Sequence, residues 1–376
     1  MKIRIISLFL IILCTISLVS CEEFIKNTTD SISHNDTTTN KENNTTVKYE
    51  YIDGCFPDPA VPTEYLENGL ALFLNEDGKS YSVAIGNFEG EELVIPSHHD
   101  GLPIVTIQEC GFINNKSLKS VTLPETIIVI GFCAFSNCDS LQDLNIPNSV
   151  KEIHCTAIAS CPLLKEIYIP ASVEYIHENA FDSNLNLVSF NVDTENQYYK
   201  SIDGNLYTKN GDTLIQYATG KTEKSFAVPQ GVTLISGRAF ADCIYLEDIY
   251  IPESVVEIGQ GAFRECHGLT NVTFAEKSKL EIINGSTFFG CVSLEYIYLP
   301  DSVKELWSGV FWGCSSLKEI NMGENVKYFG QHLLHQCYAL EKIVFRGSMS
   351  QWNRIEKDQL WQTHANQNYI LECLKK

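Results

Sequence analysis

The chain has 376 residues, of which 44% are hydrophobic and 20% charged, so most of it can bury a core. At about 150 residues per domain, this length alone suggests two or three domains, which the repeat described below replaces with one elongated array. Lys and Arg number 27 against 47 Asp and Glu, which gives a formal charge of −20. This balance argues against nucleic-acid binding, which calls for a basic surface, and against electrostatic docking on anionic lipid. Fourteen cysteines are too many for an ordinary cytosolic enzyme and too sparse for a disulfide-stabilised miniprotein.

The amino terminus has the pattern of an export signal, predicted over residues 1–20. Lys2 and Arg4 precede an apolar run that is too short for a membrane-spanning helix. The run leads to Leu18-Val19-Ser20-Cys21, and these four residues resemble the bacterial lipobox. The resemblance implies cleavage before Cys21, acylation of its thiol and new amino group, and stable attachment to a membrane. Plain secretion with a chance cysteine is the alternative.

The segment that follows, residues 21–50, is dominated by Asn, Thr, Ser, Asp and Lys. Such a composition cannot bury enough apolar area to offset the entropy of ordering the chain. We therefore expect a disordered tether, with a root-mean-square reach of roughly 30 Å.

One unit is repeated along most of the remaining chain. The strings at 141–147, 164–170 and 246–252 share the pattern LxxIxIP. The prolines, or the residues that replace them, recur at positions 124, 147, 170, 193, 229, 252, 275, 300, 323 and 346. Nearly every step is 23 residues, with 25 residues from 275 to 300 and 36 from 193 to 229. A period of this length is typical of solenoids, in which each unit buries its apolar face only by stacking on its neighbours.

The residue pattern predicts the parts of one coil. LxxIxI alternates with the period of a short strand that has one buried face, and proline ends it. Ser-Val-x-x-Ile then forms a second short extended segment, as at 254–258. Ala-Phe-x-x-Cys, as at 262–266, turns the corner and buries an aromatic ring. The sequence therefore predicts a mainly β fold.

The unit LxxIxIPxSVxxIGxxAFxxC resembles the BspA-type leucine-rich repeat. This resemblance implies a right-handed leucine-rich-repeat solenoid of about ten 23-residue coils with hairpin caps. It divides the chain into a lipoprotein signal peptide (1–20), a tether (21–50), an amino-terminal cap hairpin region (51–92), the repeats (93–346) with a hairpin insertion (193–225), and a carboxy-terminal cap (347–376).

A column of small polar residues occupies one fixed position of the repeat. The column consists of Asn115, Cys138, Cys161, Asn184, Cys243, Cys266, Cys291, Cys314 and Cys337. Exchange of Cys and Asn suits a buried corner at which a small side chain bonds to loop carbonyls. Seven cysteines interrupted by Asn cannot form a complete ladder of disulfides, so we expect buried thiols.

Metal, cofactor and catalytic motifs are not expected. His332-x-x-His335-x-Cys337 has the best spacing for a metal, but the repeat already explains Cys337, and we expect the two histidines to face solvent. His98-His99-Asp100 is expected to lie in a turn before the first coil. Phosphate-loop, zinc-protease, nucleophile-elbow and calcium-loop motifs do not occur in the sequence.

A binding face is the more natural hypothesis. Residues on either side of the second apolar position of LxxIxI point away from the core. They place acids beside tyrosines, a residue type that is enriched at recognition surfaces. The candidate ligand-binding residues are Tyr168, Tyr250, Tyr296, Tyr298, Asp143, Glu166, Asp248 and Glu319. The alternative is that Tyr simply suits exposed strand positions and that the acids keep the surface soluble.

These features together predict an exported protein at the cell envelope or cell surface that is anchored through lipidated Cys21. We expect a non-enzymatic binding protein whose partner is a protein or glycan at the cell surface. The resemblance implies adhesion to host matrix proteins or to other microbes, on a bacterium or on a protist that carries such repeats. A structural or envelope-assembly lipoprotein without a host ligand is the alternative function, and an enzyme assembled from separate coils is a third.

Overall fold

The structure is a computed structural model that describes residues 61–375, and from Pro62 onward these residues form one compact unit. The predicted signal peptide, the tether and Cys21 lie outside the described residues. Within residues 61–375, no helix is long and apolar enough to cross a membrane.

Each coil contributes a strand to a first row, where LxxIxI forms the strand as its alternation predicts. β11 (Glu166–Ile169) and β19 (Asp248–Ile251) alternate exposed and buried residues along their length. The other strands of this row are β4 (Glu92–Val94), β7 (Ser120–Thr122), β9 (Asp143–Asn145), β13 (Ser189–Val192), β17 (Ser225–Ala227), β21 (Asn271–Phe274), β23 (Tyr296–Tyr298), β25 (Glu319–Met322), β27 (Lys342–Ser348) and β29 (Ile370–Lys375). We call their outward side the strand face.

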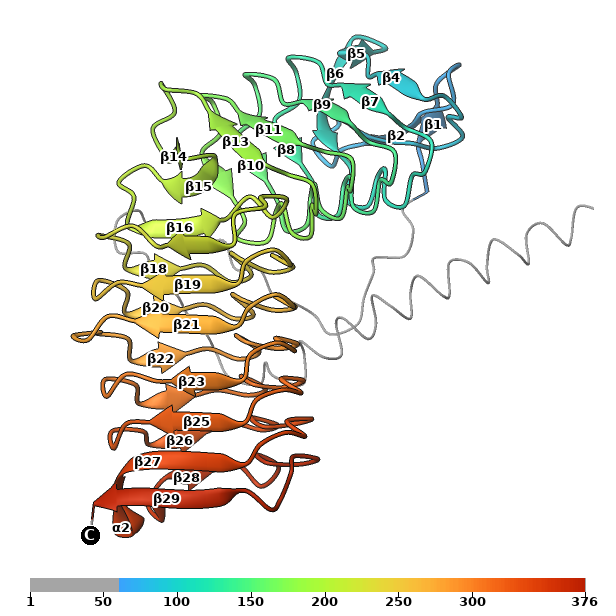
Figure 1. Cartoon of the computed structure of the whole chain (residues 1–376). Helices are drawn as coiled ribbons and strands as arrows, with labels where there is room; N and C mark the ends of the chain where they lie inside the picture. Colours follow the sequence, from blue (N-terminus) through green and yellow to red (C-terminus); the bar gives the residue numbers. More distant parts are fainter. Residues whose placement is uncertain (1–60, 376) are drawn as a thin grey trace, which may run out of the picture. The chain divides into compact units, whose positions relative to one another are not determined.

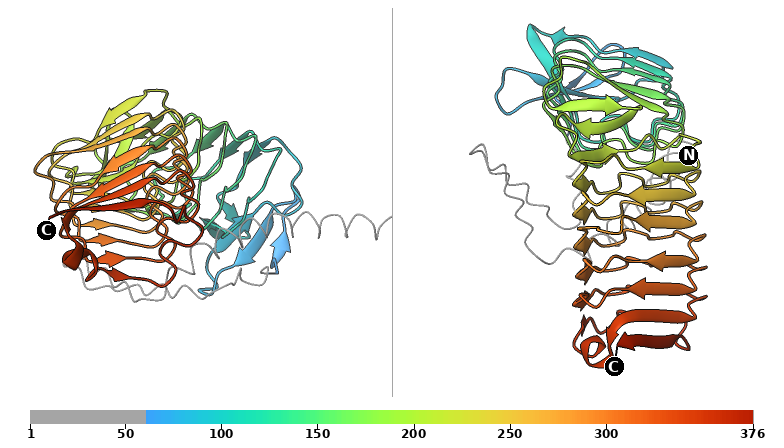
Figure 2. Two further views of the ribbon diagram at one scale, coloured as in Figure 1. Left: turned by 60° about the horizontal axis from the view of Figure 1, so that its bottom comes forward. Right: turned by 60° about the vertical axis from the view of Figure 1, so that its left-hand side comes forward.

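A second row runs along another side of the coils, and many of its short strands come from the Ser-Val-x-x-Ile segments and their variants. Its strands are β6 (Leu102–Ile107), β8 (Val129–Ile130), β10 (Glu152–Ile153), β12 (Tyr175–Ile176), β16 (Thr213–Gln216), β18 (Leu234–Ile235), β20 (Glu257–Ile258), β22 (Ile282–Ile283), β24 (Glu305–Leu306), β26 (Tyr328–Phe329) and β28 (Glu356–Lys357). Neighbouring coils pair in parallel, and from β16 to β29 they lie one above another (Figures 1 and 2).

Aromatic rings stack along the inside of the solenoid. Phe240, Phe263 and Phe288 occupy the Ala-Phe position of successive coils and are fully buried. Their ring centroids lie 4.9 and 5.5 Å apart, with interplanar angles of 12° and 8°. The coil spacing thus brings each ring into contact with the next, which one coil alone cannot achieve. The mainly β leucine-rich-repeat solenoid predicted from the sequence is confirmed, with about 13 turns where about ten coils were expected.

Both ends of the array carry elements that cover the apolar cross-section. At the amino-terminal end, β2 (Ala71–Leu74) and β3 (Tyr81–Ala84) form an antiparallel hairpin that β1 (Glu64–Tyr65) extends. At the other end, α2 (Met349–Trp352) begins with a capping box at Ser348. Trp361 stacks on Phe329 with centroids 5.2 Å apart. An open apolar end would otherwise meet water.

The 36-residue step contains an insertion that divides both strand rows. β14 (Tyr199–Ile202) and β15 (Asn205–Thr208) form an antiparallel hairpin across Asp203 and Gly204, which have φ angles of 49° and 74°. Positive φ at both turn residues is the geometry that Asp-Gly favours. The ladder of the second row stops at β12 and begins again through β16.

Buried polar contacts join the coils on the two sides of this insertion. The guanidinium of Arg238 donates to the Asp182 carboxylate at 2.5 Å, and both side chains are about nine-tenths buried. The Ser183 hydroxyl donates to Asp242 at 2.6 Å, and the Gly237 amide donates to Glu178 at 3.3 Å. We call this set of contacts the joint.

Candidate binding surface

The predicted ligand-binding residues all lie on first-row strands. Tyr296 and Tyr298 are 58% and 57% exposed, and Tyr168 and Tyr250 are 46% and 43% exposed. Asp143, Glu166 and Asp248 are exposed as well, and Glu319 is half-buried.

Only some of these residues lie together. Tyr296 is the direct neighbour of Glu319 across the β23–β25 pair, and Tyr298 is the neighbour of Asn321. Asp248 and Tyr250 lie in the sheet that precedes this pair, and Asp143 lies in the first of the four sheets of the row.

Tyr168 lies in another sheet, on the far side of the insertion. Its hydroxyl donates to the Asp193 carboxylate at 2.6 Å. This hydrogen bond raises the pKa of Tyr168 and lowers that of Asp193. Tyr168 is therefore engaged by the next coil and is separate from the tyrosines of β23.

A groove opens on the strand face where the repeat has 25 residues instead of 23. β21 ends one sheet and β23 begins the next, so the parallel ladder is interrupted between two strands that still contact each other. The groove between them has a volume of about 310 Å³. This value is at the lower end of the roughly 300–1,000 Å³ typical of ligand pockets. We call it the strand-face groove, and its walls include Asn271, Thr273, Phe274, Tyr296, Tyr298 and Glu319.

Tyr298 is held in place by Arg346, which reaches it from β27. The guanidinium carbon lies 4.1 Å from the centre of the Tyr298 ring. The same side chain donates to Asp301 at 2.9 Å, to the Leu299 carbonyl at 2.5 Å, and to the Asn321 side chain. The positive guanidinium is attracted to the electron-rich face of the Tyr298 ring, and its several hydrogen bonds fix the plane of the guanidinium. The Tyr298 wall of the groove is therefore ordered before any ligand arrives, which lowers the entropic cost of binding.

Sequence reasoning selected the tyrosines and Glu319 but missed what assembles them into a groove. Asn271 and Thr273 occupy outward positions of LxxIxI but were not among the candidates, and Arg346 was recognised only as a substitute for proline in the repeat. The available signal was the 25-residue step, because two extra residues in one coil must displace that coil relative to its neighbours.

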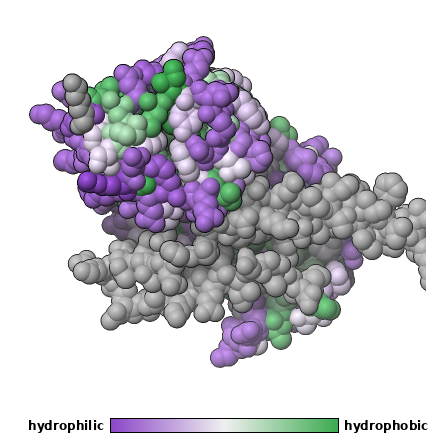
Figure 3. Space-filling view, turned by 90° about the horizontal axis from the view of Figure 1, so that it is seen from below, coloured by the Kyte–Doolittle hydropathy of each residue, from purple (hydrophilic) through white to green (hydrophobic). Residues whose placement is uncertain are grey.

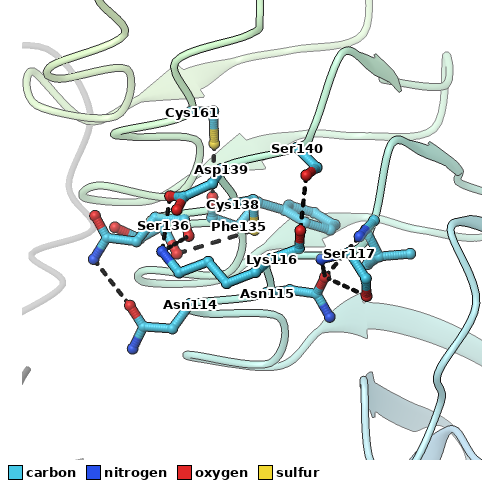
Figure 4. A network of polar contacts seen from close by, with 12 residues as sticks. Asn114, Asn115, Lys116, Ser117, Phe135, Ser136, Cys138, Asp139, Ser140 and Cys161 are labelled. Atoms are coloured by element: carbon cyan, nitrogen blue, oxygen red, sulfur yellow. Dashed lines mark hydrogen bonds and ion pairs between the residues drawn. The ribbon is translucent and has the colours of Figure 1, made fainter. Parts of the chain in front are cut away.

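The small polar column lies at the corner of the coils, where most of its side chains bond to a carbonyl of the preceding coil. The thiol of Cys161 donates to the Phe135 carbonyl at 3.0 Å, and that of Cys314 donates to the Phe288 carbonyl at 3.0 Å. Asn184 reaches the Ile158 carbonyl in the same way, at 2.7 Å. Figure 4 shows the hydrogen bond from Cys161 to Phe135 and the polar residues around it. Cys and Asn therefore exchange because both donate to a carbonyl at this point.

Most of the corner thiols have raised pKa values, and Cys138, whose pKa is lowered by a hydrogen bond with Cys161, is the exception. The cysteines of the described residues are unpaired thiols, and the seven of the column are buried. Burial raises the pKa of Cys337 to about 12 and raises that of Cys266 still further. A reactive cysteine needs the opposite shift, because the thiolate is the nucleophile.

The expectation that His332 and His335 face solvent is wrong. Both rings are half-buried against Trp312, with centroid distances of 5.4 and 4.4 Å. His364 of the carboxy-terminal cap covers His335 at 4.8 Å. Burial, followed by the charges of His332 and His364, lowers the pKa of His335. The sequence could not show this packing because Trp312 and His364 belong to other coils.

The surface of the protein is mixed in character. On the side shown in Figure 3, hydrophilic residues predominate and surround smaller hydrophobic areas. Along the solenoid, exposed ion pairs join successive coils, as between Lys151 and Glu174 at 2.7 Å. No broad apolar area is therefore visible on this side of the described residues.

Known structures share this architecture. A leucine-rich cell-surface protein of Faecalibacterium prausnitzii is 26% identical over 80% of this chain and 99% of its own, with a TM-score of 0.58. The pneumococcal vaccine antigen PcpA is 19% identical over 82% of this chain and 98% of its own, with a TM-score of 0.63. A leucine-rich repeat protein of Eubacterium ventriosum is 18% identical over 79% of this chain and 93% of its own, with a TM-score of 0.57. The last two likenesses concern the fold alone, and no curated protein matches the chain.

The repeat itself identifies the family. Residues 91–209 and 233–357 match the BspA type leucine-rich repeat region in six copies, and these ranges cover more than half of the chain. The gap between the two ranges contains β16 and β17, next to the insertion. The protein belongs to the BspA-type leucine-rich repeat family.

Proposed function

We propose that this protein is a cell-surface binding protein that presents its strand face to a protein or glycan ligand, in adhesion to host matrix proteins or to other microbes. The proposal has support from the F. prausnitzii relative, which is described as a cell-surface protein. The export signal and the tether that the sequence predicts in front of the array support display outside the cell.

Lipidation of Cys21 is the proposed means of attachment. The lipobox-like residues Leu18-Val19-Ser20-Cys21 support it, and the polar stretch that follows would hold the array away from the membrane. Two or more acyl chains give stable anchoring, whereas one chain gives only marginal binding.

The strand-face groove is the observation that carries the binding function. Two largely exposed tyrosines form one wall, and polar side chains of Asn271, Thr273 and Glu319 complete the lining. Tyrosine supplies rigid contact area with a polar tip, and buried aromatic anchors dominate the energy of most interfaces. The lining thus offers an aromatic surface for an apolar group and hydrogen-bonding partners for a polar one.

Replacing Tyr296 and Tyr298 together with Ala is expected to weaken ligand binding at least tenfold. Loss of one tyrosine hot spot typically costs about 2 kcal/mol or more, which exceeds the 1.4 kcal/mol of a tenfold change. The purified full-length chain is first screened on an array of extracellular-matrix proteins and glycans. The strongest binder is then titrated against wild type and variant by surface plasmon resonance.

Tyr338→Ala is the matched control, because Tyr338 is 62% exposed but follows the corner residue Cys337 and lies off the strand face. It should bind as wild type does. Equal binding by the Tyr296→Ala/Tyr298→Ala variant would show that the ligand uses another surface.

A further inference from the structure

Three side chains with metal-binding atoms converge at the amino-terminal end of the array. They are Glu64 of β1, His99 of β5 (His98–His99) and Asp100 of the turn that follows. One ligand atom from each residue lies within 4.8 Å of the other two. The His99 Nε2 atom is 3.0 Å from Glu64 Oε2 and 3.7 Å from Asp100 Oδ2. We call this group the cap cluster.

The backbone fixes two of the three residues. His99 pairs with Leu102 of β6 in an antiparallel hairpin whose turn is Asp100-Gly101, with φ angles of 47° and 78°. Two positive φ values define a tight type I′ turn, for which Asp-Gly is a preferred sequence. The His99 ring also packs edge-on against Tyr81, with centroids 5.8 Å apart. Glu64 and His99 therefore lie on strands, and Asp100 lies in the tight turn between β5 and β6.

The His99 Nε2 atom faces both carboxylates of the cluster. It is shielded from solvent and lies at ion-pair distance from Glu64 and Asp100. When the ring is protonated these contacts are ion pairs, and when the proton is on Nδ1 alone the Nε2 lone pair faces the two carboxylates. A cation bound in place of the Nε2 proton would attract the imidazole nitrogen and both carboxylates.

We propose that Glu64, His99 and Asp100 form a binding site for a divalent transition-metal cation of the zinc class. Zn²⁺ binds imidazole nitrogen and carboxylate oxygen at about 2.0–2.2 Å, so two ligands of a tetrahedral ion lie roughly 3.4 Å apart. The observed distances of 3.0 and 3.7 Å lie on either side of this value. Ca²⁺ and Mg²⁺ prefer oxygen ligands alone, and the imidazole therefore favours zinc. Water would complete the coordination.

The site would fasten the first described strand to the cap hairpin. Among the described strands β1 pairs only with β2, through Glu64↔Leu72 and Tyr65↔Ala71. A metal that links Glu64 to the β5–β6 hairpin would close the end of the solenoid, where an unsealed apolar edge is most costly. Binding to the folded state alone stabilises it, and the effect grows with metal concentration.

Sequence alone did not connect these residues. His99 and Asp100 were noted together, but Glu64 is 35 residues earlier in the chain and carries no motif. The fold brings it to them through β1, β2 and β3.

The test uses the full-length chain after removal of metals with EDTA. Zn²⁺ is added during isothermal titration calorimetry and during thermal unfolding. Wild type should bind Zn²⁺ at the cap cluster and unfold at a higher temperature in its presence. Asp100→Asn and His99→Gln should bind one equivalent less, or bind that equivalent at least tenfold more weakly, and the rise in unfolding temperature should be smaller.

Asn is favoured at positive φ, so Asp100→Asn keeps the turn and removes only the carboxylate. His98→Ala is the matched control, because the neighbouring His98 side chain is exposed and bonds to Ser97 instead. It should bind Zn²⁺ as wild type does. Equal Zn²⁺ uptake by wild type, Asp100→Asn and His99→Gln overturns the proposal, and so does a wild-type chain that takes up no Zn²⁺.

Discussion

Replacing Phe263 with Ala is expected to lower the free energy of unfolding by about 3–5 kcal/mol, the usual cost of removing a buried phenyl ring. Phe263 is fully buried between Phe240 and Phe288, with stacked centroids at 4.9 and 5.5 Å. Its loss leaves a cavity and separates two rings that both contacted it. Urea unfolding of the full-length chain, followed by circular dichroism, measures the change.

The loss of stability should depend on how much side-chain volume is removed at position 263. Phe263→Leu keeps most of the apolar volume and should recover more than half of the stability. Tyr250→Ala serves as a surface control, because Tyr250 is 43% exposed on the strand face and should change stability little. A loss below about 1 kcal/mol in Phe263→Ala would contradict a core held together by contacts between coils.

Replacing Arg238 with Ala should be as damaging, with an expected loss of about 3–5 kcal/mol. Arg238 is the charged partner of Asp182 across the joint, at 2.5 Å, and both are largely shielded from water. Burial raises the pKa of Asp182, while the charge of Arg238 opposes this shift. Without Arg238 the buried carboxylate must stay charged at a high desolvation cost or take up a proton. The same unfolding assay reads out the change.

Two comparisons isolate the buried charge from the loss of packing. Asp182→Asn/Arg238→Met removes both charges and should be more stable than Arg238→Ala, because no unpaired ion remains. Lys151→Ala breaks an ion pair whose partners are 46% and 49% exposed and should cost under about 1 kcal/mol. An Arg238→Ala loss as small as that of Lys151→Ala would show that the ion pair does not hold the joint.

The fold could be predicted because each coil repeats the same short residue pattern. The alternation of Leu246, Ile249 and Ile251 marks the buried side of β19, and Pro252 follows directly after it. The recurrence of Ala262-Phe263 and its equivalents places one ring per coil. The pattern that predicts one coil lies within 23 residues and recurs along the chain. An irregular residue in one coil therefore does not change the predicted fold.

The groove, the joint and the cap cluster were not predictable in the same way, since each arises where the repeat is interrupted. Asp182 and Arg238 face each other only because the insertion brings together coils that are 56 residues apart. Glu64 meets His99 through the cap hairpin. Tyr298 is fixed by Arg346, which is two coils further along the chain. A single-unit pattern contains no information about contacts between unlike coils.

The contrast between regular coils and interruptions of the repeat also matters for function. The regular coils supply a stiff support, and the irregular coil at 275–300 supplies the recess. Functional sites are expected where local rules are broken on a rigid scaffold. This reasoning favours the strand-face groove over the separate Tyr168 as the centre of recognition.

Surface proteomics on intact cells tests the central claim of display most directly. Cells are treated briefly with protease, and peptides in the medium and in the membrane pellet are identified by mass spectrometry. The account predicts that peptides from residues 61–375 are released from intact cells, while an acylated peptide that begins at Cys21 stays in the pellet. An array that survives on intact cells, but is degraded once the cells are lysed, would contradict display and would instead indicate an inward-facing envelope lipoprotein.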